Sequence, residues 1–319
     1  MAANYWDSTQ RKYWTFTKQQ LAQERRKNEE ADRALVQQFP LPDRRLLSIH
    51  FNHQLCKLAR PLSVRQQAIA TAQIYVRRFY LKVEIRRTNP TLVLATALYL
   101  ACKMEECPQH IRMVLAEARH CWDTTLTDTS KLGECEFSLI SELNSQLIIH
   151  HPYRALAEYT ATFALSAEES ALAWSIVNDH YLTDLPLLHP PHVIAVTAIF
   201  LAVVLKPTQG GLGVSAQGVQ GVLQSLSATM GQSSPARGGG AATSAPGTPG
   251  GSLGGGGGAA AQNRMMGLVS WLAESSVDIE AVVDAMQELL SLYEIWEQFT
   301  NNLCKDQIAK FVKARGLDK

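Results

Sequence analysis

Apolar residues recur along the chain at spacings of three and four, which places them on one face of a helix. No useful stretch alternates apolar and polar residues as a half-buried strand does. The pattern predicts an all-α protein. After a polar N-terminal helix over residues 9–35, five helices are expected to begin near Pro42, Ser63, Pro90, Pro108 and Ser130.

The third of these helices is apolar on every face over residues 92–102, so it should be the central helix around which the others pack. A second set of five helices is expected to begin at Pro152, Ser166 and Pro191 and to continue over residues 264–273 and 277–299. Its third helix contains an apolar run of 13 residues, 193–205, which suits a buried helix and is too short to span a bilayer.

The two sets are copies of one sequence. Residues 70–103 and 171–204 align at an offset of 101 positions without a gap, and 10 of the 34 pairs are identical. Chance would give about two, and a period this long indicates two similar domains rather than a solenoid. We therefore expect an N-terminal helix over residues 1–40, a first five-helix domain over 41–150, a second over 151–300 and a C-terminal tail over 301–319.

The second domain is interrupted by a segment of different composition. Residues 207–262 contain 17 of the 20 glycines, one charged residue (Arg237) and no aromatic residue. Such a segment cannot bury enough apolar surface to order itself, so we expect a disordered Gly/Ala/Ser-rich insertion. The entropic cost of closing a loop grows only with the logarithm of its length, so one domain can tolerate a long insertion.

Charge is unevenly distributed, although the net charge is only +1. Residues 1–103 contain 18 Lys and Arg against 7 Asp and Glu, whereas residues 104–319 contain 12 against 22. A basic front half can face phosphates or an acidic partner. The arginines are dispersed, however, so an ordinary solvated surface is the preferred interpretation.

No catalytic motif is present: the chain has no Gly-x-Ser-x-Gly, no His-Glu-x-x-His and no kinase catalytic loop. His50, His53 and Cys56 are spaced three apart on a predicted helix, but a fourth ligand is missing, so we predict no metal site. We expect neither an enzyme nor a protein that carries a cofactor.

The two copies differ most where their third helices end. The first ends in Lys103-Met104-Glu105-Glu106, whereas the second continues as Val204-Leu205-Lys206-Pro207. Charges at the end of a buried helix must reach solvent or a partner, because unpaired burial is costly. A frayed helix end in water is the alternative. A further acid, Glu136, lies next to an apolar stripe and is either a surface acid or one member of an interface pair.

At these residues the chain resembles the cyclins, which have two five-helix cyclin boxes after an N-terminal helix. The stretch Ala101-Cys102-Lys103-Met104-Glu105-Glu106 is similar to the family's usual ending of the third helix, Ala-Ser-Lys-x-Glu-Glu. Residues 4–10, 151–154, 172–179 and 181–191 resemble the C-type cyclins in particular. The resemblance covers nearly the whole chain apart from the insertion and the tail.

The resemblance implies a non-catalytic subunit that binds and activates the catalytic subunit of a cyclin-dependent kinase. Lys103 and Glu136 match the pair that contacts the kinase's mobile regulatory helix, with Glu105 and Glu106 beside them. For C-type cyclins it further implies a place in the Mediator kinase module, in the nucleus, regulating transcription by RNA polymerase II. Neither nucleic acid nor a membrane is an expected direct partner.

A second candidate surface contains Trp6, Trp174, Asn178 and Asp179. Tryptophan is favoured at interface hot spots, so this surface is a candidate for docking other subunits of the Mediator kinase module. Simple packing between helices explains Trp174 equally well.

Two alternatives remain. A transcriptional cyclin similar to cyclin H or to the cyclin T/K group would activate a different kinase by the same mechanism. A general transcription factor similar to the B-type initiation factor uses the same duplicated helical fold to bind DNA. That interpretation needs basic faces on both repeats, whereas residues 104–319 carry a net charge of −10.

Overall fold

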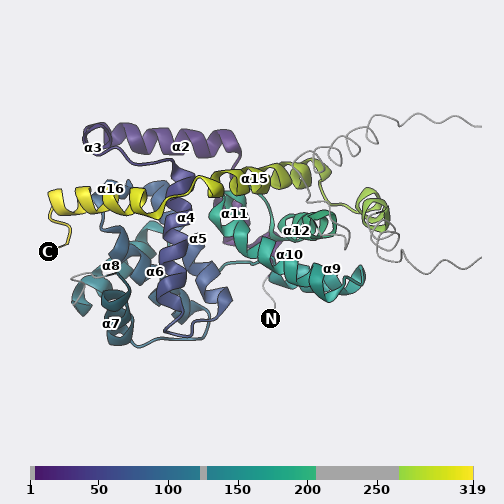
Figure 1. The fold of residues 1–319 in the computed structure, drawn as a ribbon, viewed down its shortest axis with the longest axis horizontal. Coiled ribbons are helices and arrows are strands. Elements are labelled where there is room, and N and C mark those ends of the chain that lie inside the picture. Colours follow the sequence, from purple (N-terminus) through teal and green to yellow (C-terminus); the bar gives the residue numbers. More distant parts are fainter. Residues whose placement is uncertain (1–3, 123–127, 206–265, 319) are drawn as a thin grey trace, which may run out of the picture.

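The computed structural model describes residues 4–122, 128–205 and 266–318, and these residues form helices and no strand (Figure 1). The first bundle consists of α4 (Arg44–Ala59), α5 (Gln66–Lys82), α6 (Pro90–Met104), α7 (Ile111–Trp122) and α8 (Thr129–Glu142). The second consists of α9 (Tyr153–Thr162), α10 (Ala167–Asp179), α12 (Pro191–Leu205), the helix of residues 266–274 and α15 (Ile279–Glu297). The predicted all-α fold with two five-helix units is confirmed. The insertion predicted over residues 207–262 lies outside the described residues.

The remaining described elements precede, link or follow the helices of the two bundles. They are η1 (Tyr5–Asp7), α1 (Thr9–Tyr13), α2 (Lys18–Ala31), α3 (Arg33–Gln38), η2 (Ile85–Arg87), η3 (His180–Leu182), α11 (Leu185–Leu188) and α16 (Asn301–Ala314).

The internal duplication is visible in the helix boundaries. The starts of α5 and α10, the starts of α6 and α12, and the ends of α6 and α12 are each separated by the offset found in the sequence. Both central helices carry a buried threonine, Thr96 or Thr197, whose hydroxyl donates to the backbone carbonyl four residues earlier at 2.8 Å. This bond satisfies a polar group inside an apolar core, so the repeated threonine is compatible with full burial.

The N-terminal segment is not the single helix predicted over residues 9–35. The chain leaves helical conformation after Tyr13, and Thr17 starts α2 with a capping box that it forms with Gln20. Between the two helices the buried Trp14 indole donates to the Gln146 side chain at 2.6 Å. The break therefore lets this segment pack against the linker between the bundles, which periodicity alone does not reveal.

The last helix, α16, returns to the first bundle, although the sequence predicted only a tail there. Cys304, Ile308 and Phe311 are buried in the core of the first bundle, and the Phe311 ring lies 6.5 Å from the ring of Phe39. Figure 1 shows α16 lying across the helices of the first bundle, beyond the end of α15. The first core therefore includes residues that come after the whole second bundle.

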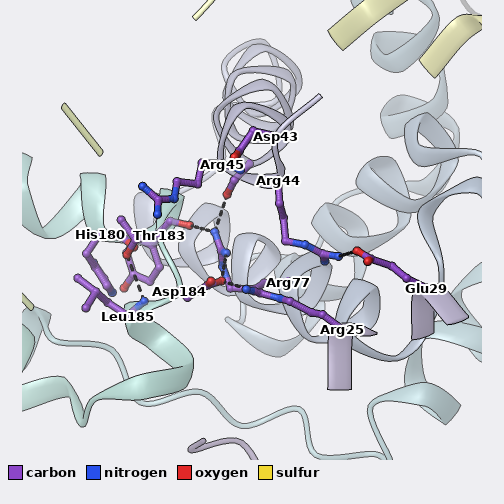
Figure 2. Close-up of polar contacts among 12 residues, drawn as sticks. Arg25, Glu29, Asp43, Arg44, Arg45, Arg77, His180, Thr183, Asp184 and Leu185 are labelled. Carbon is purple, nitrogen blue, oxygen red and sulfur yellow. Dashed lines mark hydrogen bonds and ion pairs between the residues drawn. The ribbon is translucent and has the colours of Figure 1, made fainter. Parts of the chain in front are cut away.

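A half-buried ionic cluster joins the N-terminal helix to both bundles (Figure 2). The Asp184 carboxylate accepts from Arg25 of α2 at 2.6 Å and from Arg77 of α5 at 2.8 Å. Arg77 also donates to the Ser48 hydroxyl and to the Tyr181 carbonyl. Burial alone would raise the pKa of Asp184, but Arg77 and Arg25 lower it to about 2. Asp184 is therefore an ionised anchor between the two bundles.

Candidate functional site

The C-terminal end of α6 is closed by a tight turn. The Glu106 N–H donates to the Lys103 carbonyl at 3.4 Å and the Cys107 N–H to the Cys102 carbonyl at 2.9 Å, the bond pair of a Schellman cap. Glu106 has φ of +53°, in the left-handed region that favours glycine. The turn leaves Lys103 and Glu106 exposed at the end of a buried helix.

Lys103 and Glu136 are brought together, as the resemblance implies. Helix α8 packs against α6, and the Lys103 ammonium forms an ion pair with the Glu136 carboxylate. The same ammonium lies 4.6 Å from the centroid of the Tyr99 ring, one turn earlier on α6. Glu136 is only 15% exposed because it continues the buried stripe of α8, whereas Lys103 reaches solvent. The pair presents a positioned cation at the surface.

The residues that follow the two members of this ion pair in the sequence, Met104 and Phe137, are large and apolar and lack cover in the described part of the chain. Phe137, next to Glu136, is 78% exposed, and Met104, next to Lys103, is also exposed. The sequence analysis missed both. Phe137 could have been found because it falls outside the stripe formed by Leu132, Leu139 and Leu143. Exposed apolar side chains on the same two helix ends as an ion pair are typical of a protein-binding surface.

Glu105 points inward and has a different environment. Its carboxylate accepts from Gln67 and from Thr71, each at 2.6 Å, and lies 3.7 Å from the His151 ring. Burial alone would raise the pKa of Glu105, but His151, Thr71 and Gln67 hold it below its ordinary value. His151 in turn contacts the Tyr181 hydroxyl at 2.7 Å, so Glu105 connects the end of α6 to the second bundle.

The two tryptophans of the second candidate surface lie in separate contacts. Trp6 is 52% exposed, and its ring lies 5.5 Å from that of His192 near the start of α12. Trp174 is 39% exposed and stacks on Tyr153 with 5.0 Å between ring centroids. Each therefore has one face packed and leaves part of its ring open.

Asn178 and Asp179 form hydrogen bonds within the chain. The Asn178 amide oxygen accepts from the Tyr153 hydroxyl at 2.9 Å and from Gln66 of the first bundle at 3.2 Å. Asp179 accepts from the Tyr293 hydroxyl at 3.1 Å. Burial raises the pKa of Asp179 to about 6, although the bond from Tyr293 opposes this. Asn178 and Trp174 therefore both contact Tyr153, whereas Asp179 contacts Tyr293 of α15.

The two histidines that were considered as metal ligands, His50 and His53, make other contacts within the chain. No group of three or more His, Cys, Asp or Glu among the described residues could hold a metal ion. His50 instead bonds to Asn301 at 2.8 Å, and the His53 ring packs on Trp296 and Phe299. Among the same residues, no helix has the length and apolar character needed to cross a bilayer.

Comparisons with known proteins identify the family of the chain. Residues 13–148 match the family described as the cyclin N-terminal domain. The chain is 55% identical over 324 residues to the RNA polymerase II holoenzyme cyclin-like subunit of Aspergillus oryzae, with 100% of both chains covered. It is 50% identical over 345 residues to the protein of the same name from Neurospora crassa, again with 100% of both covered. The chain belongs to the cyclin family, and its relatives there are cyclin-like subunits of the RNA polymerase II holoenzyme.

Solved structures share the fold at low sequence identity. A chain of the CAK complex from Chaetomium thermophilum is similar with a TM-score of 0.58 and 20% identity over 97% of this chain and 86% of that one. A chain of the yeast TFIIK complex gives a TM-score of 0.51 and 20% identity over 62% of this chain and 85% of that one. These likenesses support the double cyclin-box fold.

Proposed function

We propose that this protein is the regulatory, non-catalytic subunit that binds and activates a cyclin-dependent kinase of the Mediator kinase module. The observation that carries the proposal is the Lys103–Glu136 ion pair, whose two residues are each followed in the sequence by an exposed apolar residue, Met104 and Phe137. The relatives' name, RNA polymerase II holoenzyme cyclin-like subunit, supports a role in transcription by that polymerase and hence in the nucleus. Residues 41–150 and 151–300 would be the two cyclin boxes.

The mechanism is a shift between two states of the kinase. Protein kinases transfer phosphate only when a lysine of strand three and a glutamate of the regulatory helix are brought together. A subunit that binds only the active arrangement favours it, and a change from 1:99 to 99:1 needs about 5.5 kcal/mol of differential binding. The exposed Phe137 and Met104 would supply apolar contact area, while Lys103, Glu106 and Glu136 would fix the register of the kinase helix.

The four predicted kinase-binding residues have different parts in this proposal. Lys103 and Glu106 are exposed and Glu136 is 15% exposed beside Lys103, and a partner helix would contact these three. Glu105 is engaged by Gln67 and Thr71, so we assign it to holding the end of α6 in place. It would act on the kinase through the position of Lys103.

Charge reversal tests the proposal. Lys103→Glu or Glu136→Lys should weaken kinase binding by about 30-fold or more, since breaking a buried charged contact costs about 2–5 kcal/mol. The double reversal, Lys103→Glu with Glu136→Lys, restores an ion pair within the chain, so its folding stability should recover. Its kinase binding should stay lost, because the charges facing the kinase remain inverted.

The measurement is co-purification of the kinase from native extract, with mass spectrometry to name it and far-UV circular dichroism to verify helix content. Arg154→Glu is the matched control, because Arg154 makes an exposed ion pair on α9 in the second bundle. Normal kinase binding by the double reversal would contradict the interface. Recovery of a kinase other than that of the Mediator module would instead favour a cyclin H-like or T/K-like protein.

The partly open tryptophans support a second proposal, a docking surface for other subunits of the Mediator kinase module. Trp6 and Trp174 would be its contacts, Asn178 would orient Tyr153 beneath Trp174, and Asp179 would fix α10 against α15. Trp174→Ala should release those subunits while the kinase remains bound. Loss of both together with helix content would assign Trp174 to packing alone.

The DNA-binding alternative makes a distinct prediction. A B-type initiation-factor-like protein would bind duplex DNA with an affinity that falls steeply with salt. We expect no such binding from this chain, and salt-sensitive binding to duplex DNA would favour that alternative.

A further inference from the structure

A chamber of about 290 Å³ lies beside Asp184, where α2, the start of α4 and the second bundle meet. Arg25, Arg44, Arg45 and Arg77, all labelled in Figure 2, line this chamber. Its charged lining consists of five cations, Lys18, Arg25, Arg44, Arg45 and Arg77, and three carboxylates, Asp43, Asp184 and Glu288. The lining therefore carries an excess of positive charge.

Part of that charge is balanced at the rim. Lys18 pairs with Asp284 and Arg44 pairs with Glu29, and both pairs are exposed enough for solvent to screen them. Arg25 and Arg77 are more deeply buried, and in the described part of the chain both form their ion pairs with the single carboxylate of Asp184. These two guanidinium groups therefore share one carboxylate as their ion-pair partner.

Hydrogen-bond donors are left over. Among the described residues, the Nε atoms of Arg25 and Arg77 are buried and have no hydrogen-bond partner. The Arg45 guanidinium donates to a neutral hydroxyl, that of Ser291, at 2.8 Å. Burial lowers the pKa of Arg44, and the nearby charge of Arg25 lowers it further. These features are those of a site that a multivalent anion would stabilise.

The size and composition of the chamber select the kind of anion. Its volume of about 290 Å³ lies at the lower end of the range for ligand clefts, about 300–1,000 Å³, and is enough for one side chain that carries a phosphoryl group. Planar guanidinium groups match the oxygens of a phosphoryl group, which also carries up to two negative charges. A simple carboxylate would bring one charge to a site that already holds Asp184.

We propose that this chamber binds the phosphorylated side chain of a serine or threonine in a peptide. Arg44 and Arg45 contact the phosphoryl oxygens, and Arg25 contributes positive charge from the inner wall. The binding itself does not depend on a kinase partner. Holding a phosphorylated chain near an active kinase is a use of the site that rests on the function proposed above.

The test uses the full chain and three fluorescent degenerate peptide pools that differ at one fixed position: phosphothreonine, threonine or glutamate. Fluorescence anisotropy should show that the phosphothreonine pool binds at least about tenfold more tightly than the other two. Arg45→Ala should weaken this binding about tenfold or more, because one charge-assisted contact is lost. Arg60→Ala, at the other end of α4 and equally exposed, removes the same charge outside the chamber and should have no such effect.

A variant that moves affinity in the opposite direction completes the test. Asp43→Asn keeps an oxygen that can cap α4 but removes a carboxylate from the lining, so it should tighten binding of the phosphothreonine pool severalfold. Equal binding of the three pools, no measurable binding, or equal effects of Arg45→Ala and Arg60→Ala would overturn the proposal. Co-purification of the kinase should be unchanged in all three variants, which separates this site from the kinase-binding surface.

Discussion

Replacing Asp184 by asparagine keeps the shape of the side chain but removes the negative charge between Arg25 and Arg77. Burial alone would raise the pKa of Asp184, yet Arg77 and Arg25 hold it at about 2, compared with an ordinary value of 3.8. At about 1.4 kcal/mol for each pH unit, the ionised carboxylate contributes about 2–3 kcal/mol to folding stability at pH 7. The side chain is 22% exposed, so solvent screens this contribution only partly.

The sign of the pH dependence follows from the lowered pKa. A carboxyl whose folded-state pKa is depressed stabilises the protein above its unfolded-state pKa, and the contribution disappears as pH falls through the folded-state value. Urea unfolding followed by circular dichroism should therefore show Asp184→Asn about 2–3 kcal/mol less stable than the parent at pH 7. At pH 3 the difference should fall to about half.

The matched control is Glu158→Gln, which removes one carboxylate from an exposed ion pair with Arg154. Exposed pairs of this kind contribute about 0–1 kcal/mol, so its unfolding curve should nearly coincide with that of the parent. Equal stability of Asp184→Asn and the parent at pH 7 would refute the reasoning, and so would a difference that stays the same at pH 3.

Three further predictions rest on single residues. Because Glu106 occupies a left-handed position, Glu106→Gly should raise stability by about 0.5–1 kcal/mol in urea unfolding, while loss of the side chain weakens kinase binding. Ala164→Gly, at the equivalent exposed position after α9, should raise stability without affecting kinase binding. The folded-state pKa of Asp179 is raised to about 6, so the protein loses stability as pH rises through that value and the buried carboxylate ionises. Asp179→Asn should therefore stabilise the protein by about 1–2 kcal/mol at pH 8 and not at pH 4. Phe311→Ala should lower stability by about 3–5 kcal/mol in calorimetry, because the ring is fully buried in the first core, whereas Leu303→Ala on the exposed side of the same helix should change it little.

Local signals in the sequence were sufficient to predict the helices of the two bundles. The apolar periodicity, the prolines at the first turn and the offset between the copies located α6 and α12, because each depends on residues near in sequence. The break after Tyr13 was missed since its cause is distant: Trp14 bonds to Gln146, and the Phe16 N–H to the Leu187 carbonyl.

The candidate site was predictable only in part. Lys103 and Glu136 were placed by resemblance to a family, and their ion pair is formed between two helices that periodicity had located separately. The inward direction of Glu105 depends on Thr71 and His151, one before it and one well after it in the chain. Spacing along a single helix carries no information on such contacts. The sequence therefore could not distinguish the exposed Glu106 from the hydrogen-bonded Glu105.

The return of α16 to the first bundle has a consequence for synthesis. The ribosome makes Phe311 only after the second bundle. The first bundle therefore leaves the exit tunnel without the α16 side chains that complete its core. Until α16 packs against it, the first bundle of a nascent chain exposes apolar core surface that chaperones can bind. A product truncated before α16 should therefore compete poorly for the kinase that we propose as the partner.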